Sequence, residues 1–426
     1  MKQALSRILR VLLPDPLYRR LFGAYHLALA HLGAYRYRFP SRELRVIAVT
    51  GTKGKSTVVE LIRAILIEAG HTVASASTIR FCIGGECEPN LYKMTMVGRF
   101  FLQRFMRRAA DAGATHAVIE MTSEGAVQFR HKAIELDALV FTNLAPEHLE
   151  SHGGIEAYAD AKLSIARHLE SSPKRPRYIV ANADDAYGKR FLETNVEVRA
   201  PFSLADAEPY SVDDRGARFV WRGELFTSPL PGIFNLKNIL AALTLCEALG
   251  VPREKMKRAV EKLSVVAGRA ERIERGQPFA VIVDYAHTPD SLRALYETYT
   301  HGGKRLIGVL GSTGGGRDTW KRPAMGKLAD AFCDIAFLTD EDPYDEDPKK
   351  IIDEIARGFS RIAPRIIIDR QGAIRAALSE ARPGDRVLIT GKGTDPYIMR
   401  AHGAKEVWSD KKIAEEELDR LIARQG

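Results

Sequence analysis

The chain has 426 residues, of which 45% are hydrophobic and 27% charged, as in ordinary globular enzymes. This length exceeds one compact core and predicts two or three domains. The net charge is +9, from 63 basic and 54 acidic residues, but the sequence has no long Lys/Arg run with interleaved aromatic residues. We therefore expect no nucleic-acid partner, and small anionic molecules instead.

The N-terminal 40 residues carry apolar residues at helical spacing, interrupted by Pro14 and Pro16. No apolar run approaches the roughly 20 residues that span a bilayer, and a signal-peptide pattern is absent. Residues 1–40 are predicted to be a short helical arm. A basic amphipathic helix on a membrane surface is one interpretation, and a helix packed on the neighbouring domain is the favoured one.

Four cysteines occur without Cys-x-x-Cys spacing, at positions 82, 87, 246 and 333. Isolated cysteines in a chain of this length favour free thiols in a reducing compartment over a disulfide framework. We therefore expect a cytoplasmic protein, and we expect a monomer.

Residues 46–50 form a short apolar, partly β-branched run that predicts a buried strand. A glycine turn follows at 51–54, and an apolar helical pattern begins at Lys55. Strand, glycine turn and helix N-terminus together predict a phosphate cradle, in which unpaired N–H groups and the helix dipole face the anion. Lys55 would reach the outer phosphates of ATP, and the Ser56 hydroxyl would bind magnesium.

Alternating short strands and helices then continue to about residue 266. Strands are expected at 72–76, 116–121, 138–143 and 178–182, with a loop or hairpin at 79–96 and antiparallel additions at 195–228. Helices are expected at 98–112, 155–169, 235–249 and 254–263. The pattern restarts with strands at 280–285, 305–310, 335–339, 366–369 and 386–390, each followed by a helix. The predicted fold is α/β: a central, mostly parallel P-loop domain at 41–266 and a Rossmann-like α/β domain at 267–426.

Several motifs follow the P-loop in a fixed order. Glu120 ends a predicted strand, at the edge where such sheets bind ligands. The next strand leads into Asn143-Leu-Ala-Pro-Glu-His148, and a helix behind it contains Lys162. Later come Asn235 and Asn238, Gly268-Arg269, Asp284-Tyr-Ala-His287, Gly315-Gly316-Arg317-Asp318, and Gly391-Lys392-Gly393.

With a shorter P-loop than usual, Thr50-Gly-Thr-Lys-Gly-Lys-Ser-Thr57, this series resembles the Mur ligase superfamily over about residues 45–400. The member that it resembles most adds the third residue of the peptidoglycan stem peptide. The resemblance implies an ATP-dependent amide ligase that acts through an acyl phosphate. It also implies small-molecule substrates: ATP, an amino acid, and a UDP-sugar-peptide or similar carboxylate.

The resemblance implies a role for each matching residue. Lys55, Glu120, His148 and Lys162 would be catalytic, and Ser56, Glu120, His148 and Lys162 would hold magnesium, with two ions expected. Lys162 would be carbamylated, which turns its ammonium into an anionic ligand. ATP would be bound by Thr50, Gly51, Thr52, Gly54, Lys55, Ser56, Thr57, Asn235, Asn238, Arg269 and Asp284. The other substrates would be bound by Thr122, Ser123, Glu124, Arg130, Arg317, Glu341, Asp342, Tyr344, Gly391 and Asp395.

The sequence also departs from the family. Only about 40 residues precede the P-loop, where nucleotide-sugar ligases carry a uridine-binding domain, so the arm would replace that domain or recruit a partner. Thr122-Ser-Glu-Gly125 stands where the third-residue ligase has Ser-Ser-His-Gly, and Glu341-Asp-Pro-Tyr344 stands for its Asp-Asn-Pro-Arg.

The arginine of that motif clamps the distal carboxylate of diaminopimelate. Tyr344 offers no fork and no charge, and the surrounding loop is acidic, with Glu341, Asp342 and 345–347. Unless Arg317, Lys321 or Lys392 compensates, this acidic loop favours a diamine such as lysine over diaminopimelate.

Alternatives remain open for the reaction. Within the superfamily, a folylpolyglutamate-type or an amidating ligase would use the same P-loop. Outside it, a P-loop switch would hydrolyse ATP to move a partner.

Overall fold

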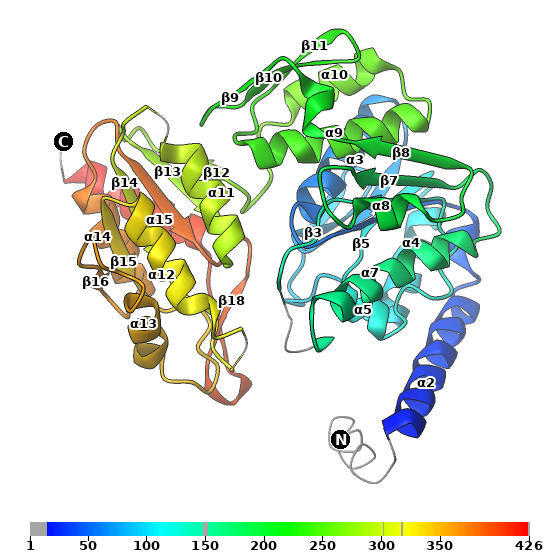
Figure 1. Ribbon diagram of the computed structural model, residues 1–426, viewed down its shortest axis with the longest axis horizontal. Coiled ribbons are helices and arrows are strands. Elements are labelled where there is room, and N and C mark those ends of the chain that lie inside the picture. Colours follow the sequence, from blue (N-terminus) through cyan, green and yellow to red (C-terminus); the bar gives the residue numbers. More distant parts are fainter. Residues whose placement is uncertain (1–14, 148–151, 301, 317, 425–426) are drawn as a thin grey trace.

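The structure is a computed structural model that describes residues 15–147, 152–300, 302–316 and 318–424. Two lobes stand side by side, each built on its own sheet (Figure 1). The P-loop lobe contains strands β1–β11 and their helices, and the C-terminal lobe contains β12–β19 and theirs. The predicted α/β class, with a P-loop sheet followed by a second α/β unit, is confirmed.

The P-loop sheet has the strand order β4-β3-β2-β5-β1-β6-β7-β8. Its parallel strands are β1 (Arg45–Thr50), β2 (Val73–Ala76), β5 (His116–Glu120), β6 (Ala138–Phe141), β7 (Tyr178–Asn182) and β8 (Val198–Phe202). The hairpin β3 (Arg80–Ile83) and β4 (Glu86–Pro89) extends one edge, as predicted for 79–96. Because β1 lies between β5 and β6, the ends of these three strands meet beside the glycine turn.

The prediction of antiparallel strands for 195–228 was wrong for its first part, since β8 pairs parallel with β7. An edge strand buries only part of its surface, so its alternating pattern does not distinguish the two orientations. Strands β9 (Tyr210–Val212), β10 (Ala217–Trp221) and β11 (Glu224–Ser228) do form a separate antiparallel sheet.

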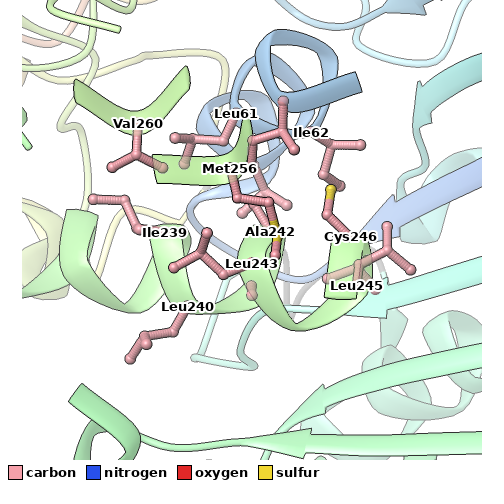
Figure 2. Close-up of a cluster of buried hydrophobic side chains, with 14 of the residues drawn as sticks. Leu61, Ile62, Ile239, Leu240, Ala242, Leu243, Leu245, Cys246, Met256 and Val260 are labelled. Atoms are coloured by element: carbon pink, nitrogen blue, oxygen red, sulfur yellow. The ribbon is translucent and has the colours of Figure 1, made fainter. Parts of the chain in front are cut away.

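Helices cover both faces of the P-loop sheet. On one face lie α3 (Lys55–Glu68), α9 (Ile233–Ala248) and α10 (Arg253–Lys262), whose apolar side chains pack together in Figure 2. On the other lie α4 (Arg99–Asp111), α5 (Ser123–Val127), α7 (Ile155–Glu170) and α8 (Gly188–Leu192). In β1, Ile47 and Val49 join the first cluster while Val46 and Ala48 join the second, which explains the strand's unbroken apolar run.

The C-terminal sheet has the order β12-β13-β17-β14-β15-β16. Its strands are β12 (Glu271–Ile273), β13 (Ala280–Asp284), β14 (Leu306–Leu310), β15 (Ile335–Leu338), β16 (Arg365–Ile366) and β17 (Arg386–Thr390). Its helices are α11 (Pro289–Thr300), α12 (Lys321–Phe332), α13 (Pro348–Ala356), α14 (Arg370–Glu380) and α15 (Asp410–Ala423). Antiparallel β12 and the hairpin β18 (Tyr397–Met399) and β19 (Lys405–Val407) were not predicted, because three-residue strands are too short to show a period.

The arm forms helix α2 (Asp15–Arg36), followed by a 3₁₀ turn, η1 (Pro40–Arg42). Ala30 and Ala34 are fully buried, and His26 lies 2.7 Å from an Arg99 nitrogen of α4, so α2 packs on the P-loop lobe as favoured above. Leu17, Leu21 and other apolar residues of α2 stay exposed. Within the described ranges, no helix combines the length and apolarity needed to cross a membrane.

The expectation of four free thiols was wrong. Cys82 and Cys87 are opposite one another on β3 and β4 and form a disulfide, with Cα atoms 4.1 Å apart. The search for Cys-x-x-Cys spacing missed them because the tight turn at Gly84-Gly85 brings residues five apart into register. Cys246 and Cys333 are free and buried.

Candidate active site

The phosphate cradle forms where β1 turns into α3. Gly51 and Gly54 have φ values of 145° and 82°, and Gly54 is the N-cap of α3. Lys55 Nζ donates to Thr52 O at 2.9 Å and lies 3.9 Å from Glu120. Burial lowers the pKa of Lys55, while the neighbouring carboxylates oppose that shift. The turn therefore holds a buried cation beside the helix N-terminus, as phosphate binding requires.

The threonines of the P-loop join it to the neighbouring strand ends by hydrogen bonds. Thr50 Oγ1 donates to Met121 O at 3.0 Å, and Thr57 is buried at the start of α3. Thr52 Oγ1 accepts from Ala145 N at 3.0 Å and lies 3.2 Å from the Tyr158 hydroxyl. These side chains tie the turn to the ends of β5 and β6, so their contribution is to fix the loop.

Glu120, at the end of β5, is the centre of the candidate metal site and is 2% exposed. It accepts from Ser56 Oγ at 3.0 Å and from Thr78 N at 2.9 Å. A carboxylate and a hydroxyl beside a phosphate cradle are the oxygen ligands that magnesium prefers, so these residues fit the ion. His148 lies outside the described residues, and within those residues no group of three or more acidic, His or Cys side chains could hold a metal.

Lys162 points from α7 into the same site. Its side chain is 1% exposed, its Nζ donates to Gly51 O at 2.7 Å, and it lies 4.6 Å from the centre of the Tyr158 ring. Burial, followed by repulsion from Lys55, brings the pKa of Lys162 well below its usual value. The lowered pKa favours the neutral, nucleophilic amine of Lys162 over its ammonium form.

The asparagines of α9 lie behind the glycine turn. A Cβ atom on Gly54 would stand 2.1 Å from Asn238 Oδ1, so Asn238 packs directly on the P-loop. Asn235 Nδ2 donates to Pro231 O at 2.8 Å, which ties it to the start of its own helix. Asn238 is thus placed to set the shape of the loop, whereas Asn235 orders the chain that leads into α9.

Arg269 reaches the P-loop from the C-terminal lobe. Its Nη2 lies 3.4 Å from Ser56 Oγ, and its guanidinium is 4.5 Å from the centre of the Tyr285 ring. Asp284 accepts from the backbone N–H groups of Ala270 and Ala286, each at 2.6 Å. Burial raises the pKa of Asp284, and Arg269 opposes that shift. Asp284 therefore shapes the turn that presents Arg269.

Sequence reasoning missed a second bridge between the lobes. Glu147 Oε1 accepts from Lys53 Nζ at 3.1 Å and lies 3.1 Å from His287 Nε2. Glu147 stands inside the Asn143–His148 motif, directly before the predicted metal ligand His148. Glu147 and His287 are 140 residues apart along the chain, so no local pattern predicts their contact.

The substrate-side residues of the P-loop lobe surround α5. Thr122 caps this helix by accepting from Gly125 N at 3.1 Å, Ser123 is buried, and Glu124 is exposed. Arg130 donates to Gln128 Oε1 at 2.7 Å and to Met96 O. Glu124 is thus at the surface, whereas Arg130 is half-buried against the loop that contains Met96.

The structure also brings together the described substrate-side residues of the C-terminal lobe. Glu341, Asp342 and Tyr344 follow β15, and Gly391 and Asp395 follow β17; a Cβ atom on Gly391 would lie 2.3 Å from Glu341 Oε2. Arg317 lies outside the described residues.

Carboxylates of the acidic loop are engaged by basic side chains or by a helix N-terminus. The loop therefore no longer favours a diamine such as lysine as the added amino acid. Lys392 Nζ donates to Asp342 at 2.9 Å and to Asp395 at 3.2 Å. Glu346 binds Arg322 at 2.7 Å, and Asp347 caps α13. Burial raises the pKa of Glu341, with Lys321 opposing the shift. Asp342, Glu346 and Asp347 are close in sequence, but their carboxylates bind Lys392, Arg322 and the start of α13, respectively.

Comparison with known proteins decides the family. A model of the Mur ligase middle domain matches residues 49–246, and one described as Mur ligase, glutamate ligase domain, matches residues 268–393. A UDP-N-acetylmuramyl-tripeptide synthetase from Roseiflexus sp. (strain RS-1) is 39% identical, and the match covers 87% of this chain and 78% of that protein. The chain belongs to the Mur ligase family.

Other relatives of this Mur ligase agree. A UDP-N-acetylmuramoyl-L-alanyl-D-glutamate--2,6-diaminopimelate ligase from Syntrophomonas wolfei is 35% identical, with 91% and 81% of the two chains covered. A solved structure with the same name has a TM-score of 0.62 at 30% identity, covering 92% of this chain and 82% of its own. A Mycobacterium tuberculosis folylpolyglutamate synthase shares the fold, with a TM-score of 0.71 at 17% identity, covering 87% and 93%. This Mur ligase is an ATP-dependent amide ligase, as the resemblance implied.

Gly54→Ala tests the cradle of this Mur ligase. The new methyl group would displace Asn238 at a left-handed φ, so we expect the Kd for ATP to rise at least tenfold, about 1.4 kcal/mol. Gly70→Ala is the matched control, because Gly70 has a φ of 94° but nothing within 4 Å of the added Cβ. It should cost about 1 kcal/mol of stability and leave ATP binding unchanged. Equal ATP affinities, measured by calorimetry, would contradict this reading of Asn238.

Proposed function

We propose that this Mur ligase joins the amine of an amino acid to the carboxylate of a UDP-sugar-linked peptide, during synthesis of a peptidoglycan precursor. The observation that carries this proposal is the meeting of the two lobes, with Arg269 Nη2 3.4 Å from Ser56 Oγ. The similarity to relatives named as tripeptide synthetases and diaminopimelate ligases, at 39% and 35% identity, supports the substrate class.

Each step needs a group that lies at the junction of the lobes. The start of α3 and Lys55 would bind the ATP phosphates, while Arg269 would neutralise the charge that develops during phosphoryl transfer. Ser56, Glu120 and a carbamylated Lys162 would hold magnesium, which supplies Lewis-acid charge when bound. The peptide carboxylate would accept the γ-phosphoryl group and become an acyl phosphate. The incoming amine would then form the amide bond, and phosphate would leave.

Closure of the two lobes would protect the acyl phosphate from water. The junction is already bridged by Glu147 and His287, at 3.1 Å, beside the P-loop residue Lys53. Such bridges from both lobes support a ligase, because a reactive intermediate has to be shielded until the amine arrives. A P-loop switch forms no acyl phosphate and has no such intermediate to shield.

Phosphate release from ATP tests the proposal. We expect release to require both UDP-N-acetylmuramoyl-L-alanyl-D-glutamate and an amino acid, with one amide formed per phosphate. Release that is indifferent to both would indicate a switch. Release with a folate acceptor but not with the UDP-linked peptide would favour the folylpolyglutamate-type alternative.

A further inference from the structure

A buried group of four charges crosses the junction between the lobes, which we call the junction quartet: Lys93, Asp342, Lys392 and Asp395. Lys93 comes from the P-loop lobe, and the other three come from the C-terminal lobe. Lys93 Nζ lies 2.5 Å from Asp342 Oδ2 and 3.4 Å from Asp395 Oδ2. The side chains are 17%, 5%, 0% and 10% exposed in the order named, so water solvates none of them well.

Lys93 lies beside Tyr344, which stands where the family's Asp-Asn-Pro-Arg motif has its arginine. Its Nζ is 5.9 Å from the centre of the Tyr344 ring. The described arginines around this loop are already engaged by carboxylates: Arg322 by Glu346, Arg370 by Asp410, and Arg400 by Asp340. Lys93, which the P-loop lobe supplies, places an ammonium beside the Tyr344 ring.

The loop that carries Lys93 is fixed to the catalytic centre. Asn90 Nδ2 donates to Ser77 O at 2.9 Å and to Met94 O at 3.1 Å, which closes the loop around Lys93. Thr95 Oγ1 lies 2.8 Å from Thr78 Oγ1, and Thr78 N donates to Glu120. Lys93 itself has a left-handed φ of 50°. The loop of Lys93 is thus tied, through Thr95, to Thr78, which also positions Glu120.

The quartet contains two lysines and two aspartates, so it is electrically neutral. A ligand side chain that ends in both an ammonium and a carboxylate can replace one partner of each sign and leave every charge paired. A side chain that ends in an ammonium alone adds an uncompensated positive charge to a buried site, which is costly. The neutral quartet therefore matches a zwitterionic end group, contrary to the diamine expected from the sequence.

We propose that Lys93 binds the distal carboxylate of the incoming amino acid, in place of the arginine that Tyr344 replaces, and that it thereby selects a diamino dicarboxylic acid over a diamine. This inference rests on the proposed function, because it assigns a role within the same ligation. Asp342 and Asp395, released from Lys93, would accept from the distal ammonium. The pocket for the side chain is then complete only when the two lobes are together.

The test compares kcat/KM for diaminopimelate and lysine in wild-type protein, Lys93→Ala and Lys93→Arg, with ATP and the UDP-linked peptide saturating. Wild type should prefer diaminopimelate. Truncating one partner of a buried charge pair should lower kcat/KM for diaminopimelate at least thirtyfold, mainly through KM. The value of kcat/KM for lysine should hold or rise, because the quartet then carries one net negative charge that the distal ammonium can pair. Lys93→Arg should restore most of the preference.

Lys174→Ala is the matched control. Lys174 lies on the P-loop lobe, is 13% exposed and donates to Asp137 at 2.7 Å, so its loss removes a similar ion pair away from the quartet. It should leave the ratio of the two kcat/KM values unchanged. A parallel fall for both amino acids in Lys93→Ala, or an unchanged ratio, overturns the inference alone. Ligation of neither amino acid by wild type overturns the proposed function and this inference with it.

Discussion

Lys162→Ala should lower kcat by about a thousandfold, equivalent to about 4 kcal/mol of transition-state stabilisation. Carbamylation of Lys162 would convert its amine and carbon dioxide into a carbamate and a proton. The uncharged amine is the reactive form, and burial favours it by bringing the pKa of Lys162 well below its usual value. The carbamate would then be an anionic ligand where an ammonium would repel magnesium.

The pH dependence follows from the same chemistry. As the pH falls through the lowered pKa of Lys162, the amine takes up a proton and the carbamate is lost. Activity should therefore need more bicarbonate at acidic pH, and saturating bicarbonate should recover it. A ¹³C-bicarbonate NMR experiment should show a carbamate signal in wild type and none in Lys162→Ala.

Small carboxylates provide the control for Lys162→Ala. Acetate or formate should restore part of its activity, because a carboxylate can occupy the space of the missing carbamate. Lys174→Ala, which removes a different lysine of the same lobe, should gain nothing from them. Full wild-type activity in carbon-dioxide-free buffer, together with no carbamate signal, would show that Lys162 acts as a plain lysine.

Arg370→Met should destabilise the C-terminal lobe by about 3–5 kcal/mol, because it leaves a buried aspartate without its ion-pair partner. Arg370 and Asp410 are 1% and 0% exposed and are joined by two hydrogen bonds of 2.8 and 2.7 Å. Arg370 also donates to Thr390 O at 2.8 Å, at the end of β17. The pair therefore fastens α14 and α15 to the strand that leads into Gly391.

Arg375→Met on the same helix is the control. Arg375 also makes a bidentate pair, with Glu417, but it is 50% exposed and should contribute less than about 1 kcal/mol. Urea unfolding followed by circular dichroism measures both variants. Equal losses would show that burial of the pair does not set its contribution.

The sequence predicted the parts of this protein that obey local rules. The strand, glycine turn and helix at 46–57 follow from period and turn chemistry, and Glu120 was found because strand ends meet at one edge of a parallel sheet. The sequence could not predict which charges neutralise each other across the junction. Lys93 and Asp342 are 249 residues apart, and no local pattern links them. The three-residue strands escaped because they are too short to show a period, and the Cys82–Cys87 pairing escaped because it depends on the tight turn between β3 and β4.

The hydrophobic clusters lie within one lobe or the other, except that Phe234 of α9 packs against a cluster of the C-terminal lobe. The bridges described between the lobes are polar: Lys93 with Asp342, Arg269 with Ser56, and His287 with Glu147. Lobes built in this way can be exchanged between homologous proteins with little disturbance of either core. The junction quartet would not survive such an exchange, because its lysine and its aspartates would come from different parents. Recombination among Mur ligases would thus preserve folding more readily than the choice of amino acid.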